Sequence, residues 1–247
     1  MSRWALGALL LASACASAEP RDLRFYGYAY DQKSNRYLYT EVHHLRIDGA
    51  RWLSSDVRYV NADGTPLGHK SLDFRQDPYL PLYQLDMAGN GYREGIDQID
   101  DDKAILMKVE GGKRERNEIQ RRPAMVADAG FLPYVADHFD ELLAGKTVRF
   151  SLVVASEQTT FRFRAKRLRD ETFEGRPAVR IKIELDSLLR LLAPPLQLVF
   201  DRDERRLLEY FGLSNIHNPR TGDDYNVRIA YYDRPPADAP THLPPLD

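Results

Sequence analysis

Cysteine is almost absent from this chain. Cys15 is the single cysteine in 247 residues. One thiol cannot close an intramolecular disulfide, which excludes the small exported domains that are stapled by several such bridges. We therefore expect a fold that is stabilised by its hydrophobic core.

The sequence also lacks an excess of charge and a long apolar run. Lys and Arg total 35 and Asp and Glu total 37, for a formal net charge of −2. A dedicated nucleic-acid-binding protein would usually be clearly basic. Apart from a short apolar run near the start of the chain, no apolar stretch approaches the roughly 20 residues of a membrane-spanning helix. We expect no nucleic acid partner and no transmembrane span.

Recognisable cofactor and metal motifs are missing too. The sequence has no phosphate-binding glycine loop, zinc spacing or dinucleotide fingerprint. Acidic clusters at 97–102 and 201–204 do not keep the glycine and the distal glutamate of a calcium loop, and aspartates commonly stabilise turns. Ser214 follows Gly212 but lacks the second glycine of a nucleophile elbow, so we assign it, with Asn215 and His217, to a loop. We expect no cofactor and no metal.

The amino terminus has the anatomy of an export signal. Arg3 precedes an apolar run over 4–14, and Ala16-Ser17-Ala18 is a small-x-small cleavage site, so residues 1–18 are predicted to be a signal peptide. The predicted location is the periplasm. The alternative is a lipoprotein anchored through Cys15, but Ala12 stands where such a signal usually has leucine, which favours cleavage after Ala18.

Alternation of apolar and polar residues dominates the first part of the chain and predicts a hairpin of residues 22–31 and 36–46. If Asp31 pairs with Arg36, one face carries core residues and the other carries a set of tyrosines together with Glu41 and His43. We predict that at least three of these rings are buried under the tail or the segment 76–92, since a solvated face would rarely be so aromatic. The tyrosines are Tyr26, Tyr28, Tyr30, Tyr37 and Tyr39.

The rest of the chain reads as further strands around one helix. The helix is predicted from about Gly130 to Leu143, with Phe131, Val135, Phe139 and Leu142 on one face. Strands are expected at 50–60, 66–75, 92–98, 103–110, 113–120, 147–154, 159–167, 177–186, 196–201, 206–212 and 225–232. The predicted fold class is mainly β, a large curved antiparallel sheet (half-barrel or open barrel) with one main helix. We expect residues 19–233 to form one β-rich domain and residues 234–247 to form a proline-rich tail.

One outward face of the second half is conspicuously cationic in this pattern. Pairing Val154 with Thr159 places Arg149 opposite Arg164, which is unfavourable unless the charges are compensated. Such a face can meet anionic head groups. Glu184 and Asp186 continue the same face, so we favour a neutralised, solvated surface.

Three stretches carry a family resemblance: residues 38–43 (LYTEVH), 126–131 (VADAGF) and 210–216 (YFGLSNI). Together they resemble a family of uncharacterised exported proteins of Gram-negative bacteria, across nearly all of the mature chain. That resemblance implies no activity and no catalytic residues. The layout is also loosely similar to the half-barrels of periplasmic lipoprotein carriers, and a likeness of layout does not establish function.

The leading hypothesis is a periplasmic, non-enzymatic protein that binds an apolar or amphiphilic ligand, a lipid for example, or an envelope partner, in the concave side of the sheet. The first alternative is a hydrolase or lyase that uses Glu41 and His43, the two candidate catalytic residues. The second is a structural or assembly protein of the envelope. The candidate ligand-binding residues are Phe139, Phe150, Leu152, Phe161, Phe163, Tyr26, Tyr28 and Tyr39.

Overall fold

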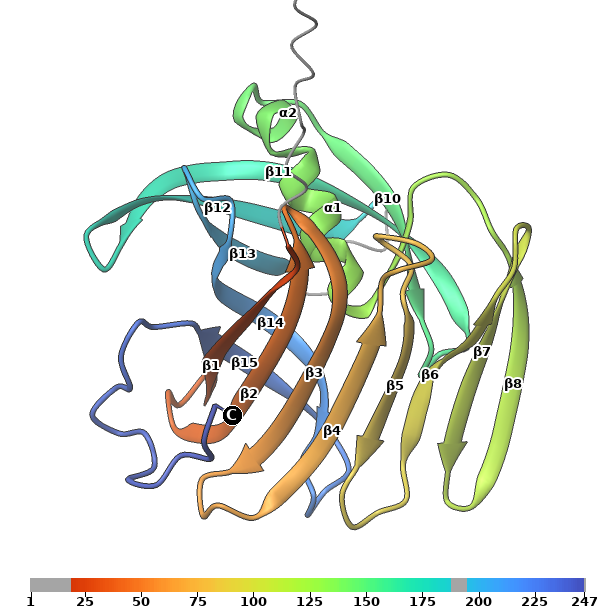
Figure 1. The fold of residues 1–247 in the computed structure, drawn as a ribbon, viewed down its shortest axis with the longest axis horizontal. Coiled ribbons are helices and arrows are strands. Elements are labelled where there is room, and N and C mark those ends of the chain that lie inside the picture. The colour runs from red at the N-terminus through yellow and green to blue at the C-terminus, as the bar shows by residue number, and fades with distance from the viewer. Residues whose placement is uncertain (1–18, 188–194, 247) are drawn as a thin grey trace, which may run out of the picture.

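A single large β-sheet forms most of the molecule (Figure 1). The structure is a computed structural model and describes residues 19–187 and 195–246, so the predicted leader with Cys15 lies outside the described residues. The strands are β1 (Arg21–Asp31), β2 (Tyr37–Asp48), β3 (Arg51–Asn61), β4 (Pro66–Asp73), β5 (Leu82–Met87), β6 (Arg93–Ile99), β7 (Lys103–Glu110), β8 (Lys113–Gln120), β9 (Met125–Ala127), β10 (Val148–Val154), β11 (Thr159–Phe173), β12 (Arg176–Leu185), β13 (Leu196–Asp201), β14 (Leu207–His217) and β15 (Asp224–Ala230).

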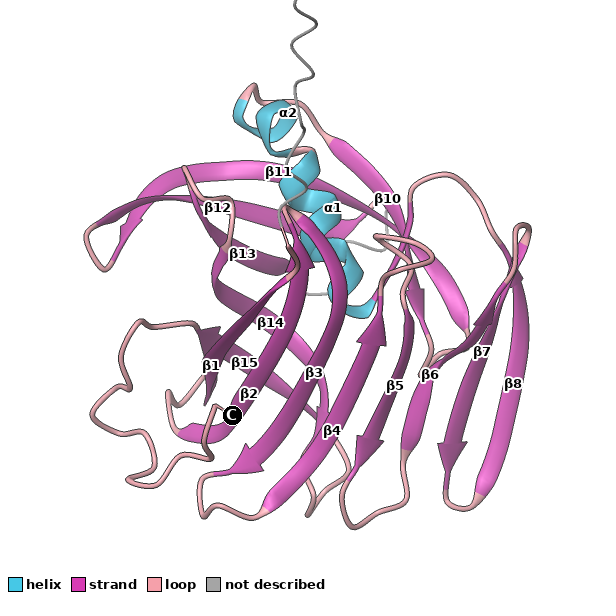
Figure 2. Cartoon of the chain, in the orientation of Figure 1, coloured by secondary structure: helices cyan, strands magenta, loops and turns pink. Residues whose placement is uncertain are grey.

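The two ends of the domain meet in the middle of this sheet. β1 pairs antiparallel with β15, from Tyr28 opposite Ala230 to Asp31 opposite Val227. From this seam, β1 to β8 meander to one edge, and β15 to β10 meander to the other, where β9 adds a short parallel strand. The strands curl into an open barrel whose edges are β8 and β9 (Figure 2). The predicted mainly β class with a large curved sheet is confirmed.

The predicted helix is broken into three short pieces. They are the 3₁₀ turn η1 (Asp128–Gly130), α1 (Phe131–Asp137) and α2 (Phe139–Leu143). The break is at His138, whose imidazole Nδ1 bonds the carbonyl oxygen of Tyr134 at 2.8 Å while its backbone leaves the helical region. The apolar face was predicted correctly, because Val135, Phe139 and Leu142 are fully buried.

Side chains from both halves of the chain share the interior. The helices pack on β10 to β13, where Phe139 lies against Phe200. Residues of β9 and β10 pack against β4 to β7 in a second cluster. A third cluster joins β1 to β5 with β14 and β15. The curl of the sheet is therefore held by apolar contacts between elements that are distant in sequence.

The register of the first hairpin differs from the prediction by one residue. Asp31 donates its backbone N–H to the Arg36 carbonyl as expected, but the ladder shifts between Ala29 and Tyr30. Beyond this irregularity Tyr28 lies opposite Thr40, and Ala29 lies opposite Tyr39. A shift of one residue moves side chains to the other face. The predicted single tyrosine face is therefore wrong: Tyr39 lies on the face of Glu41 and His43, opposite to that of Tyr26 and Tyr28.

The burial of the tyrosines is nevertheless as predicted, since Tyr28, Tyr30 and Tyr39 are at most 2% exposed. The tail covers part of this set. Tyr26 donates its hydroxyl hydrogen to the Pro244 carbonyl oxygen at 2.6 Å, and Tyr30 donates to Asp238 at 3.0 Å. The tail has no strand or helix in its described part, and it packs back on β1.

The cationic face of the second half is neutralised by ion pairs. Arg149 and Arg164 do lie opposite each other. Arg164 pairs with Glu184 at 2.5 Å, and Arg149 pairs with Asp186 at 3.1 Å. The solvated-surface interpretation is the one that these contacts support. No helix in the described part of the chain combines the length and the apolar character needed to cross a bilayer.

Candidate functional site

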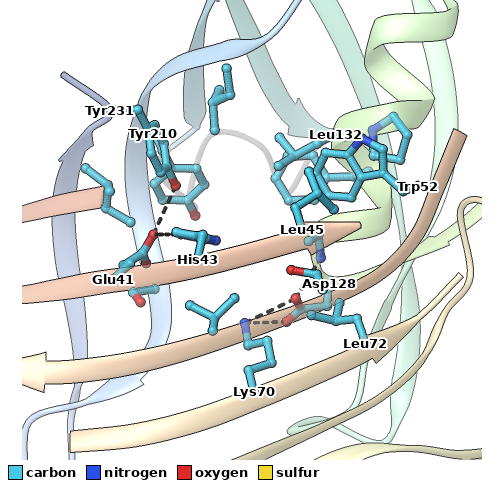
Figure 3. Close-up of a pocket in the computed structure, with 18 of the residues that line it drawn as sticks. Glu41, His43, Leu45, Trp52, Lys70, Leu72, Asp128, Leu132, Tyr210 and Tyr231 are labelled. Carbon is cyan, nitrogen blue, oxygen red and sulfur yellow. Dashed lines mark hydrogen bonds and ion pairs between the residues drawn. The ribbon is translucent and has the colours of Figure 1, made fainter. Parts of the chain in front are cut away.

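A cavity of about 1790 Å³ lies between the curled sheet and η1–α1. Its walls come from both halves of the chain, because β2, β3 and β4 face β13, β14 and the helical segment across it (Figure 3). One end is polar, with Glu41, His43 and Tyr231, and the other is apolar, with Trp52 and Leu132. The cavity is thus amphipathic along its length.

The apolar end is built by inward-facing positions of neighbouring strands. Leu45 and Leu72 extend from β2 and β4 toward Leu132 of α1. Trp52 packs edge-to-face against the buried Phe74, with ring centroids 5.4 Å apart. Leu152, Phe161 and Phe163, three of the candidate ligand-binding residues, continue this lining from the β10–β11 hairpin. Phe161 is 38% exposed and therefore lies where the cavity opens.

The polar end contains a buried carboxylate held by two donors. Glu41 Oε2 lies 2.9 Å from His43 Nε2 and accepts the Tyr231 hydroxyl at 3.1 Å. Burial, followed by the charge of Glu41, raises the pKa of Tyr231 well above its ordinary value, so this hydroxyl stays protonated and donates. His43 is further fixed by Phe25, which stacks on its ring at 4.6 Å.

Gly27 makes the space for this carboxylate. It lies opposite Glu41 in the β1–β2 ladder. A Cβ at this position would lie 2.7 Å from Glu41 Oε2 and 2.9 Å from a ring carbon of Tyr231. The absence of a side chain at residue 27 is therefore a steric requirement of the polar end.

A second polar group forms the floor of the cavity. Lys70 of β4 is paired with Asp128 of η1 at 2.8 Å, and both side chains are less than one-tenth exposed. Asn215 of β14 bonds both of them, donating to Asp128 at 2.8 Å and accepting from Lys70 at 3.2 Å. Asp128 has a positive φ of 43°, which is uncommon for a residue with a side chain. The ion pair fixes η1 to both halves of the sheet.

The floor continues toward the surface through Glu94. The Tyr92 hydroxyl donates to Glu94 Oε2 at 2.7 Å, and burial raises the pKa of the Glu94 carboxyl. His217 packs on the Tyr92 ring at 4.3 Å and pairs with Asp224 at 3.1 Å. The Asp224 hydrogen bond raises the pKa of His217. No group of three or more His, Cys, Asp or Glu residues within the described ranges is arranged to hold a metal ion.

The predicted site residues divide between cavity and core. Glu41, His43, Leu152, Phe161 and Phe163 line the cavity. Tyr26 and Tyr28 border the cavity. At this point β15 ends, opposite Tyr28, so that the first part of β1 is paired only with β2.

Three other predicted residues lie elsewhere. Tyr39 is fully buried and bonds Ser214, at 3.1 Å between the two hydroxyl oxygens. Phe139 and Phe150 are core residues behind the cavity wall.

Sequence reasoning missed the floor. Lys70 and Glu94 are charged residues within strands. In a strand, alternate residues face the interior, and only the inward-facing positions of these two residues could have identified them as site residues. Ser214, Asn215 and His217 were assigned to a loop, but they lie in β14, beyond the last predicted strand residue at 212. Asp128 is not among the predicted site residues. Asp201 does serve a turn as predicted, accepting the backbone N–H groups of Asp203 and Glu204.

Comparison with known proteins finds similarity to a solved structure and gives no function. No protein-family model and no curated protein matches the chain. The crystal structure of a β-barrel-like protein of domain of unknown function DUF1849 from Brucella abortus has 10% sequence identity and a TM-score of 0.49. That comparison covers 85% of this chain and 97% of the Brucella chain.

Proposed function

We propose that this protein is a periplasmic, non-enzymatic binder of an amphiphile, which it holds in the cavity between the sheet and α1. The observation that carries the proposal is the cavity, at about 1790 Å³ with one apolar and one polar end. Pockets for drug-sized ligands are roughly 300 to 1,000 Å³, so this volume suits a larger molecule with an extended apolar part.

The two ends have different tasks in this proposal. The wall of Leu45, Trp52, Leu72 and Leu132 removes an apolar chain from water, which is the main favourable contribution to binding. The buried polar groups at the other end set the orientation of the head group. The predicted leader supports the periplasmic part of this proposal, which is tested separately by fractionation of cells that express the full chain.

The test is recovery and reloading of the ligand. Protein purified without detergent should carry excess mass in native mass spectrometry, and an organic extract should contain an amphiphile in near-stoichiometric amount. Without residues 1–18, Trp52 is the one tryptophan left of the two in the sequence. Reloading should therefore change the tryptophan emission, and a Trp52→Phe variant should bind without that signal. A clean apo mass, an empty extract and no response to added amphiphiles would reject the proposal.

The polar end favours one second candidate, a hydrolase or lyase. Glu41 and His43 converge with the Tyr231 hydroxyl inside the cavity, as acid–base chemistry would require. In the described chain, the His43 imidazole hydrogen-bonds to Glu41 alone, so any attacking group would come from water or substrate. This candidate predicts turnover of long-chain esters that is abolished in His43→Ala. Binding of such esters without products would favour the carrier.

A further inference from the structure

We propose that the head group accepted at the polar end is a protonated primary amine, and that an anionic head group is excluded there. This inference rests on the proposed amphiphile binding and adds the chemical class of the ligand. It comes from the distribution of charge and of unused hydrogen-bonding capacity among the residues that line the cavity.

Glu41 provides an unused acceptor in the cavity wall. The residue is 5% exposed, and both of its hydrogen bonds, from His43 and Tyr231, end on Oε2. Oε1 accepts no hydrogen bond from residues 19–187 and 195–246, and the surrounding protein atoms do not enclose it fully. Glu41 lines the cavity. Oε1 therefore faces the cavity. A carboxylate oxygen accepts hydrogen bonds and cannot donate, so its ligand partner must be a donor.

The remaining buried charges of the wall leave no cation for an acidic ligand. Lys70 is the one buried cation among the described lining residues, and Asp128 and Asn215 already engage its ammonium group. Glu94 adds a third buried carboxyl group to those of Glu41 and Asp128. An anion placed among these groups would lose its hydration without gaining a counter-charge, which is strongly unfavourable.

Aromatic rings beside Glu41 add to the attraction for a cation. Tyr231 lies edge-on to Phe25 and to His43, with ring centroids 5.9 and 5.8 Å apart, and all three line the cavity. A cation near the face of such rings is attracted by their quadrupole. Lining arginines such as Arg21, Arg24 and Arg205 are exposed, so they lie at the rim, where a carboxylate head would otherwise go.

The experiment compares three ligands that share one chain and differ only in the head group. Binding of dodecylamine, dodecanol and dodecanoate to the protein without residues 1–18 is measured near neutral pH through Trp52 fluorescence and calorimetry. We expect the amine to bind about tenfold more tightly than the carboxylate, since one charge-assisted hydrogen bond corresponds to a factor of this order. Dodecanol should fall between the two.

Two matched variants locate the effect. In Glu41→Gln the affinity for dodecylamine should fall about tenfold, while that for dodecanol changes less than about twofold. Glu204→Gln makes the same charge change at the rim of the same cavity, where the side chain is 62% exposed and paired with Arg206. It should leave all three affinities within about twofold of wild type.

The outcomes separate this inference from the function on which it rests. Equal or tighter binding of dodecanoate by the wild type would overturn the amine assignment and place the head group at the arginines of the rim. Unchanged amine binding in Glu41→Gln would also overturn it. If Glu41→Gln does not fold, the order of the three ligands on the wild type still decides. Failure of all three to bind would reject amphiphile binding itself.

Discussion

At the scale of single residues, the polar groups of the cavity are the unusual feature of this molecule. Glu41, Lys70 and Glu94 are each at most 6% exposed, in strands whose other inward residues are mostly apolar. Burial of charged groups costs free energy unless each is paired and hydrogen-bonded. Lys70 and Glu94 have partners in the described chain, whereas Oε1 of Glu41 accepts no hydrogen bond from it.

His217 gives the residue-scale prediction, a pH-dependent contribution to stability. Its pKa is raised in the folded state, chiefly by the hydrogen bond to Asp224. A group with a raised folded pKa stabilises the fold below its unfolded pKa of about 6.5, and the contribution is lost as pH rises through the folded value. His217→Gln should therefore lower the free energy of unfolding by at most about 1 kcal/mol near pH 5.5, because Asp224 is part-exposed and screened.

The same comparison near pH 9 should show almost no difference between variant and wild type. Urea unfolding at both pH values measures the change. His69→Gln is the control, since His69 pairs with Asp56 at 2.6 Å with both side chains about half exposed, and its effect should be smaller. A destabilisation by His217→Gln that is equal at both pH values would mean that the loss comes from packing on Tyr92.

At the scale of elements, one irregularity in β2 decides which face of the sheet each tyrosine of the first hairpin occupies. The shift between Ala29 and Tyr30 puts Tyr39 on the inner face and leaves Tyr28 on the outer face. Glu41 and His43 are unaffected relative to each other, because residues two apart in a strand share a face in any register. Their pairing was therefore predictable, while their neighbours were not.

The tail is the element whose removal should matter most for β1. Truncation after Asp233 removes the acceptors of Tyr26 and Tyr30 and the Pro245 carbonyl that Arg58 bonds at 2.9 Å. At about 1 kcal/mol for each net hydrogen bond, we expect a loss of roughly 2 to 4 kcal/mol in the free energy of unfolding. Hydrogen exchange should quicken at the free edge of β1, residues 21–27.

Asp238→Ala is the matched control for this truncation, because it removes only the acceptor of Tyr30. It should cost about 1 kcal/mol. If the truncated protein unfolds at the same denaturant concentration as the full chain, the tail does not stabilise β1, and its contacts contribute nothing measurable.

At the scale of the whole molecule, the pairing of β1 with β15 makes the two halves of the sheet depend on each other. The third core cluster contains Val57 and Leu85 from the first half and Val227 from the last strand. We predict that the domain unfolds in one cooperative transition, because neither half can bury its apolar face alone.

Val227→Ala tests this cooperativity from the opposite half of the chain. Val227 is fully buried in β15, so its truncation should cost roughly 2 kcal/mol. The transition seen by Trp52 in β3 should shift as much as the transition seen by far-UV circular dichroism. Leu168→Ala, at a side chain that is 46% exposed, should change both by less than about 0.5 kcal/mol. A shift seen by only one probe would show that the halves unfold separately.

The sequence by itself determined the class of fold, most of its strands and the apolar face of the helical segment. Period-two alternation and the spacing of Val135, Phe139 and Leu142 are local properties, so they can be recognised without a structure. The close pairing of Glu41 with His43 is local for the same reason. The short strands β5 and β9 were missed, since few residues carry their pattern.

Only the tertiary structure decided what faces the cavity. Asp128, Lys70 and Asn215 lie far apart in the chain, and they meet because the sheet curls and brings β4, η1 and β14 together. The one-residue irregularity beside Tyr30 and the return of the tail over Tyr26 have the same origin. Each depends on which distant surfaces bury one another. The free energy of this burial arises only in the folded interior, so it produces no periodic pattern in the sequence from which it could be predicted.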